Sequence, residues 1–235
     1  AASVPNATEI ISNSVNLWRG KTNGYFEGRM EIFRPNAPTK KYVVHVWTKG
    51  QKKTLAKFLY PQRIKGQGIL LLGDDMWQYD PRSKRTIKLS NSVRANSFMG
   101  SDLSYDDISK TSDLIDKYNH KLLKTEKKDG HTVYTVEITP LPKSPIVWGK
   151  EIMVIRDDWV FLEHDYYDQA GKKIKTMKVT KIINIDGIPF PSEMIATNLE
   201  KPGNYTNYIA DKVDFKINID PNLFTMINLQ KDILR

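Results

Sequence analysis

Residues 66–81 read GQGILLLGDDMWQYDP, and this stretch decides the fold. Two short apolar runs stand on either side of an Asp-Asp pair, a pattern that predicts a β-hairpin. The sequence Asp80-Pro81-Arg82-Ser83 predicts the turn that follows, because Asp, Pro and Ser favour turn positions. A basic run at residues 85–89 then predicts a further strand. About three strands are therefore expected between residues 66 and 89.

The chain changes character after Ser90. Residues 97–107 read SFMGSDLSYDD, where Phe98 and Met99 are surrounded by Ser, Gly and Asp. Two large apolar side chains beside Gly100 indicate a loop that covers an apolar surface, and long irregular loops in compact domains are usually functional. We consider two interpretations of Phe98 and Met99. They form either a displaceable lid over a cavity or permanent core that anchors the insertion.

These two segments resemble the outer-membrane lipoprotein-sorting protein family, whose fold is that of the periplasmic carriers LolA and LolB. The resemblance rests on the W-x-Y-x-P strand at Trp77, Tyr79 and Pro81, and on the SFMGSDLSYDD segment at 97–107. It implies a mainly β (α+β) fold, in which a strongly curved antiparallel sheet forms an incomplete, half-open barrel with helices over the open side.

The resemblance also implies a function. The expected protein is a non-catalytic carrier or chaperone of the Gram-negative periplasm that holds the acyl chains of a lipoprotein or lipid for sorting to the outer membrane. An inner-membrane exporter and an outer-membrane acceptor are the implied partners, with peripheral membrane contact, a monomeric state and no cofactor. The alternative is a periplasmic sensor or regulatory module of the same fold that binds a lipoprotein or a partner protein.

Composition agrees with a single globular domain over residues 1–235. Hydrophobic residues make up 40% of the chain, enough for a sizeable core. No apolar run approaches the eighteen or so residues of a membrane-spanning helix. The start Ala1-Ala2-Ser3 is typical of a mature chain after signal-peptide removal, and the absence of cysteine excludes disulfides.

The formal charge of +9 makes nucleic acid or an anionic membrane surface a conceivable partner. The lysines are nevertheless scattered along the chain, and several flank turns or alternate with apolar residues. This distribution is typical of charges on the outer faces and edges of strands. Nothing in the aromatic pattern resembles a single-strand binder, so we expect no nucleic-acid partner.

The remaining elements follow from periodicity. Residues 7–19 have apolar positions at helical spacing, with Asn6 or Thr8 as the N-cap and Gly20 at the end. Residues 90–98 and 103–114 read as short helices and loops, and residues 221–227 as a short terminal helix or turn. Further strands are expected at 24–32, 41–49, 52–60, 119–127, 131–139, 150–156, 160–168, 172–185, 190–199 and 205–217.

The sequence offers no recognisable catalytic or metal motif. The run Glu163-His164-Asp165 lies in an expected strand, where neighbouring side chains face opposite sides and cannot converge on one metal ion. The acidic group Asp102, Asp106 and Asp107 is conceivable as a carboxylate acid/base pair, but it is better explained as helix N-caps. We therefore expect no enzyme activity and no metal site.

The candidate ligand-binding residues are apolar side chains expected to line a cavity or to cover it. Alternation over residues 24–32 predicts that Phe26, Met30 and Ile32 face the inside of the curved sheet while Glu27, Arg29 and Glu31 face water. The full predicted set for the cavity wall and lid is Phe26, Met30, Ile32, Trp47, Leu70, Leu72, Trp77, Tyr79, Phe98 and Met99.

Overall fold

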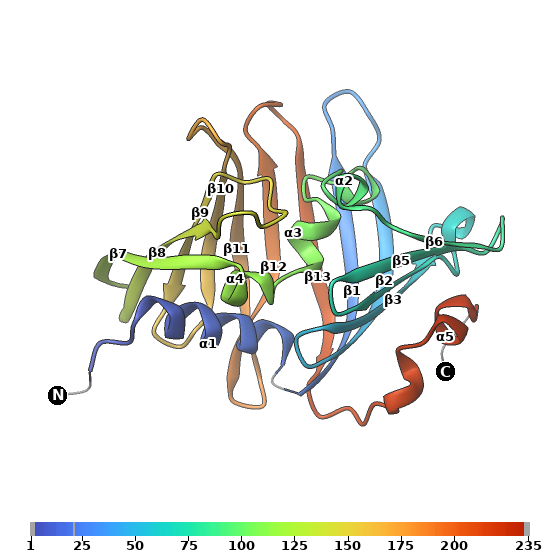
Figure 1. Ribbon diagram of the computed structural model, residues 1–235, viewed down its shortest axis with the longest axis horizontal. Helices are drawn as coiled ribbons and strands as arrows, with labels where there is room; N and C mark the ends of the chain where they lie inside the picture. The colour runs from blue at the N-terminus through green and yellow to red at the C-terminus, as the bar shows by residue number, and fades with distance from the viewer. Residues whose placement is uncertain (1–2, 21, 233–235) are drawn as a thin grey trace.

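The computed structural model describes residues 3–20 and 22–232. Within them the chain forms a single antiparallel sheet of thirteen strands (Figure 1). The strands are β1 (Asn23–Phe33), β2 (Lys40–Lys49), β3 (Lys53–Tyr60), β4 (Gly68–Leu72), β5 (Asp75–Asp80), β6 (Arg85–Lys88), β7 (Tyr118–Lys128), β8 (His131–Pro140), β9 (Lys150–Arg156), β10 (Phe161–Tyr167), β11 (Lys173–Ile185), β12 (Ile188–Asn198) and β13 (Tyr205–Asp214).

Helices are short, apart from the first. They are α1 (Ala7–Arg19), η1 (Gln62–Ile64), α2 (Asn91–Arg94), η2 (Phe98–Gly100), α3 (Tyr105–Ser109), α4 (Asp113–Asp116), η3 (Pro221–Leu223) and α5 (Met226–Gln230). Among the described residues, no helix combines the length and the apolar character needed to cross a membrane.

The order of strands explains where the insertion lies. The sheet runs β6-β5-β4-β3-β2-β1-β13-β12-β11-β10-β9-β8-β7, so β6 and β7 are its two edges. These edges do not pair with each other, and the sheet is curved but not closed. Residues 89–117, which we call the insertion, connect β6 to β7 and must therefore pass from one edge of the sheet to the other. In Figure 1 the insertion crosses in front of the sheet, with α2, α3 and α4 along its path.

The expected mainly β fold with a strongly curved antiparallel sheet is confirmed. The predicted strands each correspond to an observed strand, with ends that differ by a few residues. The predicted helix at residues 7–19 is α1. Its N-cap is Asn6, which accepts a hydrogen bond from the Glu9 N–H while the Glu9 carboxylate accepts one from the Asn6 N–H, both at 2.9 Å. This reciprocal capping box begins the helix.

Helix α1 packs on one face of the sheet, which we call the inner face. Ile10 and Ile11 are fully buried in a cluster that includes side chains of β8, β9 and β10. At the end of the helix, the Trp18 ring stacks on Phe161 with 4.7 Å between the ring centroids. The apolar stripe of α1 is thus covered by the strands that follow the insertion.

The two faces of the sheet alternate with a period of two residues. In β3, Ala56 and Phe58 lie on the inner face, and Leu55 lies on the opposite, outer face. In β4, Ile69 and Leu71 lie on the inner face while Leu70 and Leu72 lie on the outer face. Most of this strand is buried. A strand that is apolar at consecutive positions is one covered on both sides.

The C-terminal segment, residues 217–230, covers the outer face at strands β3 to β5. Ile219, Phe224 and Leu229 pack against Leu55, Leu70 and Tyr79 in a buried cluster. A Cβ atom at Gly68 would lie 2.8 Å from the Leu229 Cδ1, so the glycine leaves room for this close approach. The segment extends below and in front of β3 in Figure 1, apart from the insertion.

Strand β1 has the predicted register. Met30 and Ile32 are buried on the inner face. On the outer face, Arg29 binds the carboxylates of Asp211 and Glu31, with shortest distances of 2.6 and 3.2 Å. The charged side chains of β1 therefore alternate with its apolar ones, as periodicity predicts.

Candidate functional site

An apolar cavity of about 270 Å³ lies on the inner face of the sheet. Aromatic and aliphatic side chains make up most of its wall. Four of the chain's seven methionines are among them, and methionine is flexible enough to fill space of varied shape. The principal lining side chains are Trp18, Phe26, Met30, Ala56, Phe58, Met76, Phe98, Ile108, Met177, Phe190, Met194 and Tyr208.

Three parts of the chain build the cavity. Strands β1 to β5 and β11 to β13 contribute inward-facing residues, which follow from their alternation. The end of α1 contributes Trp18 and Arg19. The insertion contributes Phe98, Leu103, Tyr105 and Ile108. Because the insertion supplies a whole side of the cavity, whatever holds the insertion in place also determines the cavity's shape.

Asp102 holds the insertion to the sheet. Its carboxylate is almost fully buried and accepts hydrogen bonds from the Arg34 guanidinium at 2.9 Å and from the Thr206 hydroxyl at 2.7 Å. Nearby, the Tyr208 hydroxyl donates to Ser101 Oγ at 2.8 Å. Asp102 was expected to cap a helix, and its buried ion pair with Arg34 corrects that expectation.

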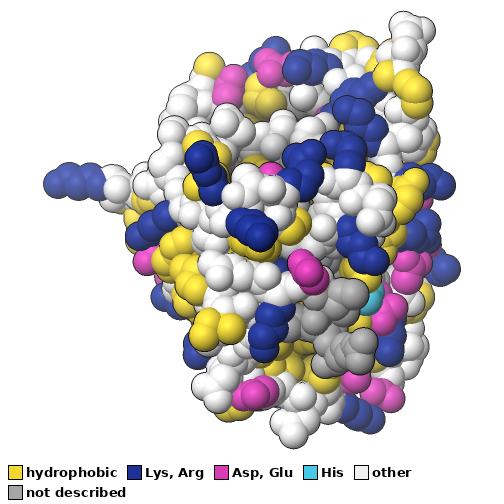
Figure 2. Space-filling model, turned by 90° about the vertical axis from the view of Figure 1, so that its right-hand side faces the viewer, with side chains coloured by type: hydrophobic (Ala, Val, Ile, Leu, Met, Phe, Trp, Pro, Cys, Tyr) yellow, Lys and Arg dark blue, Asp and Glu magenta, His cyan; other side chains and the backbone are white. Residues whose placement is uncertain are grey.

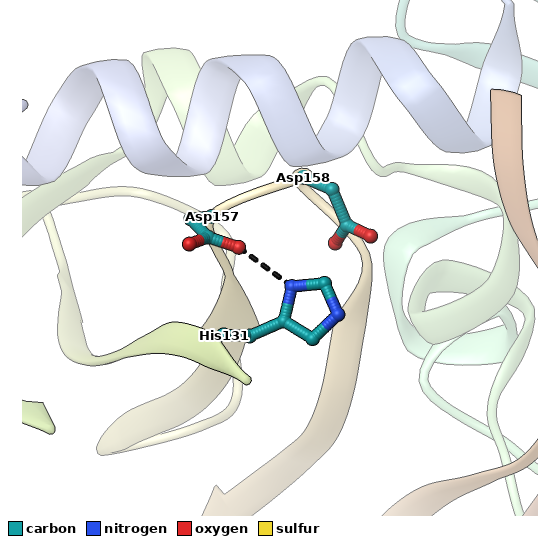
Figure 3. A group of neighbouring side chains, drawn as sticks. All are labelled: His131, Asp157 and Asp158. Carbon is teal, nitrogen blue, oxygen red and sulfur yellow. Dashed lines mark hydrogen bonds and ion pairs between the residues drawn. The ribbon is translucent and has the colours of Figure 1, made fainter. Parts of the chain in front are cut away.

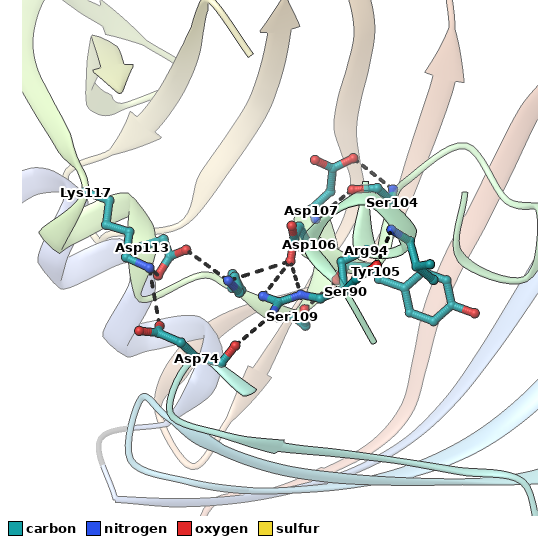
Figure 4. A network of polar contacts seen from close by, with 12 residues as sticks. Asp74, Ser90, Arg94, Ser104, Tyr105, Asp106, Asp107, Ser109, Asp113 and Lys117 are labelled. Atoms are coloured by element: carbon teal, nitrogen blue, oxygen red, sulfur yellow. Dashed lines mark hydrogen bonds and ion pairs between the residues drawn. The ribbon is translucent and has the colours of Figure 1, made fainter. Parts of the chain in front are cut away.

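A second set of ion pairs links the insertion's helices to one another and to the β4–β5 turn (Figure 4). Arg94 binds Asp106 at 2.9 Å and donates to the Asp74 carbonyl at 2.6 Å, and Lys117 lies 3.3 Å from the carboxylates of both Asp74 and Asp113. Burial raises the pKa of Asp106 despite the neighbouring Arg94. Asp106 thus has a structural partner.

Asp107 fulfils the predicted capping role. It forms a capping box with Ser104 at the start of α3, and its carboxylate also accepts from the Trp148 indole N–H at 2.9 Å and from Lys175 at 3.0 Å. Burial raises the pKa of this carboxyl group, but Lys175, the Ser104 N–H and the Trp148 N–H together bring the pKa below its ordinary value. Asp107 therefore remains an ionised, fully partnered group at neutral pH.

A second, smaller cavity of about 50 Å³ lies beside Asp107. In it, His164 Nε2 lies 2.8 Å from Glu151 Oε1, and the Tyr118 hydroxyl donates to the same carboxylate. Burial, and then the charge of Glu151, raise the pKa of Tyr118, so its hydroxyl stays protonated. Buried networks in which the members partner one another in this way rigidify a core. We read this one as structural.

The structure brings together only part of the predicted wall and lid. Phe26, Met30 and Phe98 line the cavity. Ile32 and Met99 belong to the adjoining inner-face cluster without lining the cavity itself.

The other five predicted residues, Trp47, Leu70, Leu72, Trp77 and Tyr79, do not line this cavity. They lie together on the outer face, where the C-terminal segment covers them. The reason is the alternation of the strands. Since Ile69, Leu71 and Met76 point inward, their immediate neighbours must point outward.

Several lining residues were not predicted. Met177, Phe190, Met194 and Tyr208 come from β11, β12 and β13. Met177 stands between Thr176 and Lys178, and this alternation was a usable signal for that residue. The sequence predicted Arg19 only as the last residue of a helix. No local pattern in the sequence indicates that its side chain lines a cavity.

One group of possible metal ligands exists among the described residues, at the start of β8 and in the turn that follows β9 (Figure 3). The ligand atoms of His131, Asp157 and Asp158 lie within 4.8 Å of one another. Asp157 already accepts from the Thr132 N–H at 2.8 Å and binds His131 at 2.7 Å, while Asp158 binds Arg156. These contacts tie the two segments together, and a metal would have to displace them.

Basic side chains are scattered over the surface. On the face seen in Figure 2 they are dispersed among hydrophobic, acidic and other side chains, without forming a continuous stripe. Many lysines also have acidic neighbours, such as Lys212 with Glu27 and Lys181 with Glu193. This arrangement is the one expected of outward-facing strand positions.

Solved structures share this architecture. A DUF1329 family protein from Desulfovibrio piger superposes with a TM-score of 0.84 at 24% identity, covering 97% of this chain and 100% of its own. A domain named as an outer membrane lipoprotein-sorting protein, from Vibrio parahaemolyticus, gives 0.84 at 24% identity over 96% and 98% of the two chains. A LolA superfamily protein from Nitrosomonas europaea gives 0.80 at 20% identity over 95% and 99%. At these identities the likeness shows a shared fold.

No protein of curated function matches the chain. A family model described as "Uncharacterized protein" matches residues 50–231, well over half of the sequence. The chain therefore belongs to that family, and its fold is the one shared by the outer-membrane lipoprotein-sorting domain and the LolA superfamily protein.

Proposed function

We propose that the protein is a non-catalytic carrier that binds acyl chains of a lipid or lipoprotein in the inner-face cavity. The observation that carries the proposal is the cavity itself: about 270 Å³ of space lined mostly by apolar side chains. Pockets that bind small molecules occupy roughly 300–1,000 Å³ and are lined in the same way. The shared fold with lipoprotein-sorting and LolA superfamily structures supports the same function.

The volume of the cavity indicates how much cargo it can hold in the conformation of this structure. A dry apolar cavity of about 150 Å³ accommodates benzene, so 270 Å³ suits roughly ten carbon atoms. Each buried methylene contributes about 0.8 kcal/mol. One acyl chain is therefore enough for tight capture, and a cargo with several chains requires the insertion or α1 to move outward.

The location of the carrier and its partners belong to the same proposal. Such a protein would work in the Gram-negative periplasm, take its cargo from an inner-membrane exporter and deliver it to an outer-membrane acceptor. The insertion and α1 would cover the open side of the sheet and shield the apolar cavity from water between the two membranes.

Native mass spectrometry of protein purified without detergent tests the proposal most directly. A carrier should retain one or more lipids, which extraction and fragmentation then identify. Protein from several preparations without any bound lipid, and unable to take up dodecanol, would contradict it.

Filling part of the cavity should weaken the binding of apolar ligands. Ala56 lies on the inner face and lines the cavity, so the ring of Ala56→Phe would occupy part of the space meant for cargo. We expect the affinity for the neutral fluorophore N-phenyl-1-naphthylamine to fall about tenfold, which corresponds to roughly 1.4 kcal/mol of lost burial. The matched control is Ala37→Phe, at an exposed loop position, which should bind as the wild type does. Equal binding by all three proteins would place the fluorophore elsewhere.

A further inference from the structure

One end of the apolar cavity carries a buried guanidinium. Arg19, the last residue of α1, is only 5% exposed and lines the cavity. Burial lowers the pKa of Arg19 to about 10, so the side chain is still charged at neutral pH. Burying a charge in apolar surroundings is expensive unless an opposite charge accompanies it.

Arg19 has no such companion within residues 3–20 and 22–232. Arg19 Nε and Nη2 donate to the Gly50 carbonyl at 3.4 Å, and Nη2 also reaches the Lys53 carbonyl at 3.4 Å and the Thr54 hydroxyl at 3.1 Å. These are long bonds to neutral acceptors. The six residues outside the described ranges include no Asp or Glu.

The other charged residues that line the cavity are neutralised. The Arg29 side chain lies on the outer face, where Asp211 and Glu31 hold it, and Asp107 is held by Lys175. Arg19 therefore contributes a positive charge that nothing in the described cavity wall balances. A ligand with a negative charge would balance it.

Hydroxyl groups extend this charged end. Thr48 and Thr54 face each other across β2 and β3, and both line the cavity beside Arg19. Thr48 donates to the Arg19 carbonyl at 3.2 Å. A Cβ atom at Gly24 would lie 2.7 Å from Thr48 Oγ1, so the glycine makes room for this polar corner. Apart from Asp107 and Ser109, most of the other lining side chains are apolar, so the cavity has a polar corner at Arg19 beside a largely apolar body.

We infer that Arg19 is the head-group site of the cavity and that the cargo is an acyl chain with an anionic oxygen group, a carboxylate or a phosphate. The planar guanidinium matches both groups and binds them with two parallel hydrogen bonds. Thr54 is placed to add a third. The inference rests on the proposed carrier function and narrows its cargo to anionic amphiphiles.

Three ligands of the same chain length test the inference on the wild-type protein. Dodecanol is neutral, dodecanoate carries a carboxylate and dodecyl phosphate carries a phosphate. Displacement of N-phenyl-1-naphthylamine at pH 7.5, below micellar concentrations, gives their affinities. We expect at least one anionic ligand to bind about tenfold or more tightly than dodecanol, as a hydrogen bond to a charged group provides. Preference for dodecanoate indicates free fatty acid, and preference for dodecyl phosphate indicates a phospholipid head group.

Variants test whether Arg19 causes the preference for anionic ligands over dodecanol. Arg19→Met should bring the anionic ligands down to the affinity of dodecanol while dodecanol itself binds unchanged, and Arg19→Lys should restore part of the difference. The control is Arg29→Met, which removes an arginine whose side chain lies on the outer face with carboxylate partners and should leave the preference intact.

The outcomes separate the two proposals. If wild-type protein binds none of the three ligands, the carrier function fails and this inference fails with it. If dodecanol binds as tightly as both anionic ligands, the carrier function stands and the head-group site is overturned. This second comparison needs no variant, so a poorly folded Arg19→Met protein does not prevent a decision. A preference that survives in folded Arg19→Met protein also overturns the assignment.

Discussion

Replacing Phe98 with alanine is expected to lower the free energy of unfolding by about 3–5 kcal/mol, the usual cost of removing a buried phenylalanine. The side chain is 8% exposed and packs between Phe58 and Tyr105, with ring centroids 5.9 and 5.0 Å away. Urea denaturation of both proteins measures the difference. The variant should also bind N-phenyl-1-naphthylamine no more tightly than the wild type.

The expected loss follows from how firmly the segment around Phe98 is held. The Phe98 N–H donates to the Leu103 carbonyl at 2.8 Å, and the Ser101 N–H donates to the Phe98 carbonyl at 2.9 Å. Met99 adopts the left-handed backbone conformation, with φ 54° and ψ 26°, which a non-glycine residue keeps only when its surroundings impose it. Together with the buried Asp102 ion pair, these contacts favour a fixed anchor over a displaceable lid.

A second buried phenylalanine provides the matched control. Phe224 lies in the outer-face cluster under the C-terminal segment, away from the cavity. Phe224→Ala should lose a similar amount of stability without any change in probe binding. If Phe98→Ala instead keeps nearly the wild-type stability and binds the probe more tightly, Phe98 is a lid that cargo displaces, and the anchored interpretation is wrong.

Local patterns were sufficient to predict the elements of this fold. Helix α1 is set by apolar residues at helical spacing and by the Asn6 capping box, and the strands are set by alternation and by turn residues such as Asp129-Gly130. The insertion was recognised because alternation stops after Leu89. These features depend on residues that are close in sequence, so the sequence displays them directly.

The two faces of the sheet were harder to predict, because they depend on contacts between distant residues. Trp77 and Tyr79 look like cavity residues until the C-terminal segment, more than 130 residues later, is seen to cover them. The consecutive apolar run Ile69–Leu72 was the available clue, since such a run indicates burial on both faces. The burial of Arg19 was equally hard to predict. The residues that surround its side chain come from β2, β3 and the turn between them, not from α1.

Lys57 should make the stability of the protein rise with pH. It is 4% exposed on the outer face, where its ammonium donates to the Leu229 carbonyl of the C-terminal segment and to the Gly66 carbonyl at 3.3 Å. Burial lowers the pKa of Lys57 from 10.5 to about 8, and the charge of Asp232 offsets this only in part. Between these two values the unfolded chain holds a proton that the folded protein has released. The free energy of unfolding therefore increases with pH over this interval.

The size of this effect follows from the difference between the two pKa values. A difference of this size between folded and unfolded pKa corresponds to about 3 kcal/mol. Other groups titrate in the same interval, so the quantity to measure is the difference between wild type and Lys57→Met in urea denaturation from pH 7 to pH 10. As pH rises, the free energy of unfolding of the wild type should increase relative to that of Lys57→Met, because methionine has no proton to lose. Lys53→Met, at an exposed position on the same strand, should retain the wild-type slope. Parallel curves for wild type and Lys57→Met would mean that the Lys57 ammonium stays charged in the folded protein, with the carbonyls of Leu229 and Gly66 compensating for its burial.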